Sequence, residues 1–232
     1  MKPTNSFLNS MKSQGTIYLK AIFLFSTLLL LSVGMKGQSF EGTVKYNVRV
    51  TGKASQDYLM NNPPTGIMMH IKEDNFIVKL TGGRIARTFL FIGDSNHTYV
   101  VDIPNKRYFK RTYYADTSKY VPVAAPTGKS IKVKGYDCQE YKVVRKDRKE
   151  IDLFYVNDQF KVDTTLFDTL EGAKADFLVP GLGGRIPLMK VIKIPDLTTS
   201  VELAMIKGEE FPIEAFGIPK GFSNKKKRDP RK

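Results

Sequence analysis

The stretch FEGTVKYNVRVT, residues Phe40–Thr51, decides the fold of this chain of 232 residues. Its even positions, apart from a glycine at 42, are apolar, and its odd positions are polar. Strict alternation places one side of a β-strand in a core and the other side in water. The stretch therefore predicts a half-buried strand, and the side chains expected to point inward are Val44, Tyr46, Val48 and Val50.

Similar runs follow along the chain at a spacing of ~8–12 residues, separated by Gly, Pro, Asn and Asp, which favour turns. Residues 114–128 contain two prolines and a glycine and predict a longer loop. The expected strands are Gly66–Lys72, Asn75–Leu80, Arg87–Ile92, His97–Asp102, Lys106–Thr112, Lys129–Val133, Gln139–Lys146, Glu150–Val156, Ile186–Ile194 and Ser200–Lys207.

One segment, Thr164–Asp176, is the best helix candidate, because Leu166, Phe167, Leu170 and Ala173 form an apolar stripe at helical spacing. About ten strands with one or two helices indicate a single, mainly β (α+β) domain. So many strands should curl rather than stay flat. The predicted fold is a curved antiparallel half-barrel of about ten strands, with one or two helices covering its concave side.

A curved sheet must fill its concave side either with its own side chains or with an apolar ligand. The pattern of the strands leaves both alternatives open. The residues expected to line a hydrophobic cavity are Tyr46, Val48, Phe89, Phe91, Tyr99, Val101, Leu153 and Tyr155, with Ile77 as a further inward-facing side chain.

The apolar run Ala21–Val33 lies upstream of the first strand, after Lys12 and Lys20 and before small or polar residues. A basic segment, a short apolar core and a small residue before the cut are typical of a secretory signal peptide. We expect residues 1–37 to be this signal, cleaved near Gly37. The mature protein is then periplasmic or secreted.

A retained membrane anchor is the alternative, but the run is shorter than the ~20 apolar residues that cross a bilayer. The start of translation is also open, since residues from Met11 onward already make a complete signal. We expect contact with the membrane only through this transient segment.

Net charge is concentrated at the two ends of the chain. The total of +14 includes four lysines in the signal, and residues 223–232 carry a further +5. The expected single domain, residues 38–222, is therefore only mildly basic, and the tail is interpreted as a disordered end. The basic and aromatic run 106–114 is interpreted as a solvated strand. Export removes most nucleic-acid partners, so none is expected.

The residues that could carry chemistry form no recognisable catalytic set. His70 and His97 lack the spacing of metal ligands, so no metal site and no cofactor are expected. Acidic neighbours of the single cysteine, Cys138, would raise the pKa of its thiol, and the residue is interpreted as part of the core. The sequence therefore predicts that the protein is not an enzyme.

Several short motifs span the mature chain: Phe40–Tyr46, Tyr99–Asp102, Lys106–Tyr108, Gly135–Val143, Gly184–Leu188 and Phe216–Phe222. Together they resemble an uncharacterised domain family of exported Gram-negative envelope proteins, which is similar to the LolA/LolB-type lipoprotein carriers. The resemblance covers residues 40–222. It implies a half-barrel wrapped over helices, with an apolar cavity that holds lipid acyl chains in the carriers. It assigns no catalytic residue.

Two functions from different classes follow. The first is an exported binding module that holds a hydrophobic or lipid-like ligand in the half-barrel cavity. The alternative is a structural or interaction protein of the cell envelope, with a protein partner and no small ligand. A cavity large enough for an apolar group distinguishes the two.

Overall fold

The computed structural model describes residues 39–53, 63–83, 87–95, 97–111, 122–167 and 175–224. The chain divides into two compact units, Met1–Gln38 and Ser39–Lys232, and every described residue belongs to the second. The expected signal peptide lies outside the described residues, as does most of the expected basic tail.

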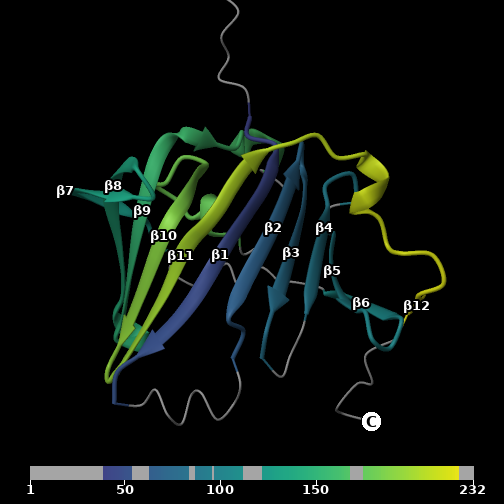
Figure 1. The fold of residues 1–232 in the computed structure, drawn as a ribbon, viewed down its shortest axis with the longest axis horizontal. Coiled ribbons are helices and arrows are strands. Elements are labelled where there is room, and N and C mark those ends of the chain that lie inside the picture. The colour runs from purple at the N-terminus through teal and green to yellow at the C-terminus, as the bar shows by residue number, and fades with distance from the viewer. Residues whose placement is uncertain are drawn as a thin grey trace, which may run out of the picture. The chain divides into compact units, whose positions relative to one another are not determined.

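Among the described residues, twelve strands form one open sheet, which has the predicted mainly β, curved half-barrel fold (Figure 1). The order across the sheet is β12-β6-β5-β4-β3-β2-β1-β11-β10-β9-β8-β7. All neighbours are antiparallel except the pair β12–β6. The strands are β1 (Gly42–Thr51), β2 (Gly66–Lys72), β3 (Asn75–Thr81), β4 (Thr88–Ile92), β5 (His97–Asp102), β6 (Arg107–Arg111), β7 (Ala125–Val133), β8 (Tyr136–Arg145), β9 (Glu150–Lys161), β10 (Arg185–Ile194), β11 (Leu197–Gly208) and β12 (Ser223–Asn224).

Strand β1 lies in the middle of the sheet, between β2 and β11. The alternation that predicted it is confirmed over most of the strand, because Val44 and Tyr46 are buried while Asn47 and Arg49 are exposed. Thr43, expected to face water, is the exception, since it is buried. Pairing of β1 with β11 joins the two ends of the domain. Several neighbouring strands are joined by tight turns, as at the β7–β8 hairpin, where the two loop residues both have positive φ.

The prediction of a loop over residues 114–128 is wrong at its end, because β7 begins at Ala125 and includes Pro126 and Gly128. Residues 114–121 lie outside the described residues. Both residues lie where the register of β7 against β8 shifts, between Pro126 and Ser130. An edge strand accepts proline because its free side needs no backbone donor. At the other end, Ser223–Asn224 pairs with β6, so the sheet extends two residues past the expected boundary at 222.

The described part of the helix candidate Thr164–Asp176 contains no α-helix. Instead, the 3-10 turns η2 (Thr164–Phe167) and η3 (Asp176–Leu178) pack Phe167 and Phe177 against the sheet. Residues 168–174 lie outside the described residues. In the part of the chain that the structure describes, the two other turns of this kind are η1 (Lys146–Arg148) and η4 (Ile213–Phe216).

The two faces of the sheet bury different sets of side chains. The face that we call inner carries Val44, Tyr46, Phe76 and Phe91, which form one cluster with Phe167 and Phe177 from the two turns. The rings of Phe76 and Phe91 stack with centroids 5.1 Å apart, and the ring of Phe177 meets Phe76 edge-on at 5.9 Å. Aromatic pairs of this kind fix the turns over the inner face.

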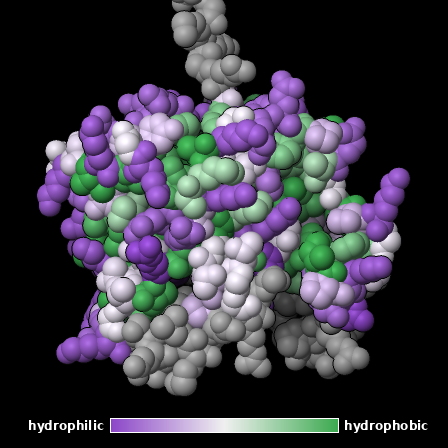
Figure 2. Space-filling view, in the orientation of Figure 1, coloured by the Kyte–Doolittle hydropathy of each residue, from purple (hydrophilic) through white to green (hydrophobic). Residues whose placement is uncertain are grey.

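Part of the opposite, outer face, over β3 to β6, packs against the C-terminal segment Phe211–Phe222, which we call the C-terminal strap. Its Phe216 packs with Ile77, Leu90 and Val101 of three neighbouring strands. Figure 1 shows the strap in yellow, running past β4 toward β6 and β12. On the side of the molecule seen in Figure 2, hydrophobic residues are interspersed with hydrophilic ones rather than joined in one surface.

Within the described residues, no helix has the length and apolar character that a membrane crossing requires.

Candidate ligand-binding site

A small pocket lies between the inner face of the sheet and η3. Its volume is about 140 Å³, and its wall comes from five strands and from the residues around Phe177. Most of the lining is apolar because these strands point their inner-face residues toward the turn. The lining residues are Tyr46, Ile67, Met69, Val78, Ala175, Asp176, Phe177, Pro187, Lys190 and Val201.

One ion pair crosses the pocket. Lys190 Nζ on β10 lies 2.7 Å from Asp176 Oδ1 on η3. The Lys190 side chain is only 15 % exposed, whereas that of Asp176 is 44 % exposed. The Lys190 ammonium also lies 5.1 Å from the ring centroid of Phe154, in cation–π geometry. The pocket thus combines an apolar wall with a single, partly buried cation.

Tyr46 closes one side of the pocket. Its hydroxyl donates a hydrogen bond of 2.9 Å to the carbonyl oxygen of Pro187. Burial, and then the charge of Asp176, raise the pKa of Tyr46 far above its usual value. The phenol therefore stays neutral and serves as a fixed donor to the backbone.

The structure brings part of the predicted cavity set together on the inner face. Tyr46 lines the pocket, and Val48 lies beside it, paired with the lining residue Val201. Phe91 is buried in the inner cluster, and the half-buried Phe89 pairs with the lining residue Val78.

The other four predicted residues lie elsewhere. Tyr99 and Val101 sit on the outer face beneath the C-terminal strap, because Leu90 pairs with Tyr99 while Phe91 pairs with Thr98. Leu153 and Tyr155 pair with Val191 and Met189, on the face of β9 and β10 opposite to Lys190, and they do not line the pocket. The eight residues therefore do not form one cavity wall.

The sequence analysis did not identify Lys190 and Asp176, the two charged residues of the pocket, as candidate site residues. A signal for Lys190 was present, since it lies between Leu188 and Ile192 at strand spacing, where an inward-facing residue is normally apolar. Asp176 has no such signal, because its position depends on how η3 packs onto β10.

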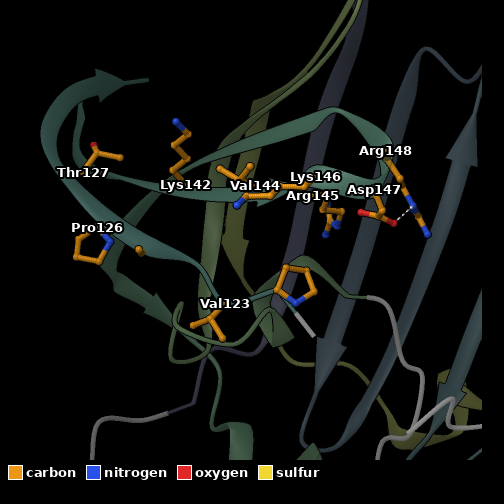
Figure 3. Close-up of a pocket in the computed structure, with 11 residues that line it drawn as sticks. Val123, Pro126, Thr127, Lys142, Val144, Arg145, Lys146, Asp147 and Arg148 are labelled. Atoms are coloured by element: carbon orange, nitrogen blue, oxygen red, sulfur yellow. Dashed lines mark ion pairs between the residues drawn. The ribbon is translucent and has the colours of Figure 1, made fainter. Parts of the chain in front are cut away.

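A second, more open groove of about 890 Å³ lies at the β7–β8 end of the sheet (Figure 3). Its cations are Lys142, Arg145, Lys146 and Arg148, and its acid is Asp147, which pairs with Arg148 at 3.6 Å. The remaining lining residues are apolar or small: Pro122, Val123, Ala125, Pro126, Thr127 and Val144.

Arg145 differs from the other cations of this groove. Its guanidinium donates to Glu150 Oε1 at 2.6 Å and to Asp152 Oδ2, so two carboxylates already neutralise it. Lys142 and Lys146 form no ion pair with any described residue and remain available to an anion. Val123 and Val144 are 56 % and 44 % exposed in the same groove.

Neither site contains a set of side chains with an evident reaction. Among the described residues, His, Cys, Asp and Glu form no group of three or more that could hold a metal ion. His70 instead shares a 2.8 Å hydrogen bond with Thr43 Oγ1, and Cys138 is fully buried in the inner cluster as predicted.

The fold and the pocket together define a class of protein: an open antiparallel half-barrel with an apolar pocket beneath a short helical turn. No family model matches the chain, and no curated protein matches it in sequence. The predicted resemblance to carrier proteins therefore stays a prediction.

Several solved structures resemble the fold at low identity. An uncharacterized conserved protein from Thermus thermophilus is 8 % identical, with a TM-score of 0.48, over 86 % of this chain and 98 % of that one. PNGF-II is 12 % identical, with a TM-score of 0.46, over 79 % of this chain but only 31 % of its own length. The lipoprotein LppX of Mycobacterium tuberculosis is 10 % identical, with a TM-score of 0.34, over 73 % and 90 %. Nothing about the ligand of this chain follows from these similarities.

Proposed function

We propose that this protein is an exported, non-catalytic binding module of the cell envelope that holds an apolar ligand on the inner face of its sheet. The pocket beneath η3 carries this proposal. Eight of its ten lining residues are apolar or aromatic, and its two charged residues pair with each other. Sites for small ligands commonly combine an apolar wall with a few placed polar groups.

The size of the pocket limits what it can hold as it stands. Its volume of about 140 Å³ is smaller than the ~300 Å³ at the lower end of ligand pockets. It accepts a short apolar group or the end of a longer chain. A larger ligand requires η3 to move away from β10.

Export is the second part of the proposal and rests on the N-terminal sequence. The segment 1–37 has the basic, apolar and small-residue regions of a cleaved signal. Mass spectrometry of the protein from its own cells should find an N-terminus near Gln38 in an envelope or external fraction. The full-length chain in the cytosol would contradict export.

Filling the pocket tests the binding function. Ala175→Leu places a larger apolar side chain in the pocket, and Ala204→Leu makes the same change at an exposed site on β11. We expect the wild type and Ala204→Leu to bind a fluorescent fatty acid, and Ala175→Leu to bind it at least about tenfold more weakly. Equal binding by all three proteins, or binding by none, would contradict the proposed site.

The groove at the β7–β8 end supports a second candidate function, that of an interaction protein. Lys142 and Lys146 present free positive charge beside the exposed Val123 and Val144. A concave groove of this kind suits an extended chain better than a flat membrane surface. The complementary partner is an acidic protein segment with interspersed apolar residues.

Charge reversal in the groove tests this second candidate. A labelled peptide of alternating Glu and Val should bind the wild type, with affinity that falls as salt is added. The double change Lys142→Glu and Lys146→Glu should abolish binding, whereas Lys129→Glu and Lys134→Glu on the same hairpin should not. Equal binding of a Lys and Val peptide would exclude the acidic partner.

A further inference from the structure

Lys190 is a cation placed where the pattern of its strand predicts an apolar residue. It lines the apolar pocket, and its only ion-pair partner among the described residues is Asp176. Withdrawing an ammonium group from water is costly unless an anion stays beside it. An anion is therefore required at this position whenever the pocket is closed to water.

The two partners are held very differently. Lys190 lies in the middle of β10, between β9 and β11, and its ammonium faces the Phe154 ring. Asp176 belongs to the three-residue turn η3, and nearly half of its side chain is exposed. The carboxylate of Asp176 can be released to water at little cost, whereas the ammonium of Lys190 cannot.

We propose that the ligand of this pocket is an amphiphile, an apolar chain that ends in one carboxylate or phosphate group. The inference rests on the proposed apolar-ligand function and adds the chemistry of the ligand's polar end. The anionic end replaces Asp176 on Lys190, and the chain lies against the wall formed by residues such as Met69 and Val201. One anion is exchanged for another, so the partly buried ammonium always has an anionic partner.

This exchange explains why a binding pocket contains an ion pair at all. With no ligand bound, Asp176 neutralises Lys190 and holds η3 against β10 by a contact of 2.7 Å. A neutral apolar ligand gains nothing from Lys190. An anionic ligand gains a charge-assisted hydrogen bond in apolar surroundings, which is stronger than the same bond in water.

Matched ligands separate this inference from the function on which it rests. The binding of dodecanoate, dodecyl phosphate and dodecanol to residues 38–232 would be measured at pH 8 by displacement of an uncharged fluorescent probe. We expect the two anions to bind at least about tenfold more tightly than the alcohol. Tighter binding of only one anion identifies the head group. Equal binding of all three ligands would overturn the inference of an anionic end but would leave the proposed apolar-ligand function standing. Binding of none of them would overturn both proposals.

Three variants locate the anion. Lys190→Met keeps an apolar side chain in place. It should lower the affinity for dodecanoate to that for dodecanol, and the affinity for dodecanol should not change. Asp176→Asn removes the carboxylate that competes for Lys190, and it should raise the affinity for dodecanoate several-fold. Lys193→Met, on the opposite face of β10, should change neither. Unchanged dodecanoate binding by folded Lys190→Met would place the anion elsewhere and overturn the inference.

Discussion

Glu140 is a buried carboxylate whose two hydrogen-bond donors come from the strands on either side of it. Tyr155 Oη and Thr127 Oγ1 both donate to it at 2.8 Å. The hydrogen bond from Tyr155 lowers the pKa of Glu140, with that from Thr127 as a further cause, against the opposing effect of burial. Burial, and then the bond to Glu140, raise the pKa of Tyr155 to about 12.

The lowered pKa makes stability depend on pH in a defined direction. In the unfolded chain the carboxyl group of Glu140 has a pKa of ~4.3, and in the folded chain its pKa is lower. The contribution of Glu140 is therefore present above the unfolded pKa and is lost as the pH falls through the folded pKa. Tyr155→Phe should cost about 1.5–3 kcal/mol at pH 7, because the bond to a charged acceptor is lost.

Urea unfolding at several pH values measures this effect. The difference in unfolding free energy between the wild type and Tyr155→Phe should shrink between pH 5 and pH 2, and it should vary less in a Glu140→Gln background. Tyr136→Phe, on the same strand as Glu140, is the control. A pH-independent loss would mean that Tyr155 contributes packing rather than a charged hydrogen bond.

Cys138 illustrates a residue that its surroundings make inert. It is fully buried in the inner cluster, and burial raises the pKa of its thiol. Because the thiolate is the reactive form, a thiol reagent at pH 8 should label Cys138 only as fast as the protein unfolds. Labelling followed by absorbance, with and without urea, tests this. Stoichiometric labelling of the native protein within minutes would contradict the buried position.

At the scale of elements, the C-terminal strap is a second layer on the outer face of the sheet. Phe216 is buried against Ile77, Leu90 and Val101. Phe216→Ala should destabilise the protein by ~3–5 kcal/mol, the usual cost of emptying a buried phenylalanine site. Ile213→Ala, in the same turn but exposed, should cost less than ~0.5 kcal/mol. Equal losses in urea unfolding would show that the strap is not anchored by Phe216.

The elements that the sequence predicted best are strands with a regular two-residue period. β2 and β5 have the predicted ends, and β1 has the predicted burial except at Thr43. The strand predicted at Lys129–Val133 is shorter than β7, because Pro126 and Gly128 were interpreted as a turn. The same two residues also fit an edge strand with a register shift. The helix candidate failed in its described part, where tertiary packing of Phe167 and Phe177 holds 3-10 turns instead.

At the scale of the whole molecule, the sheet order and the pocket depend on pairings that period alone does not specify. The alternation of apolar and polar residues predicts which residues of one strand share a face. Which of the two faces is the inner one depends on the register between strands. Phe91 and Tyr99 both fitted an inward pattern, yet their pairing places them on opposite faces. Asp176 reaches Lys190 only through the packing of η3, so the ion pair could not be predicted.

The inner face, the pocket and its single ion pair lead to one claim about the whole molecule, that it holds an apolar ligand. Native mass spectrometry of the protein purified from its own envelope tests this claim most directly. The account predicts a bound apolar molecule on the wild type that is absent from Ala175→Leu purified in the same way. A wild-type mass equal to that of the bare chain, with no uptake of a fluorescent fatty acid, would contradict it.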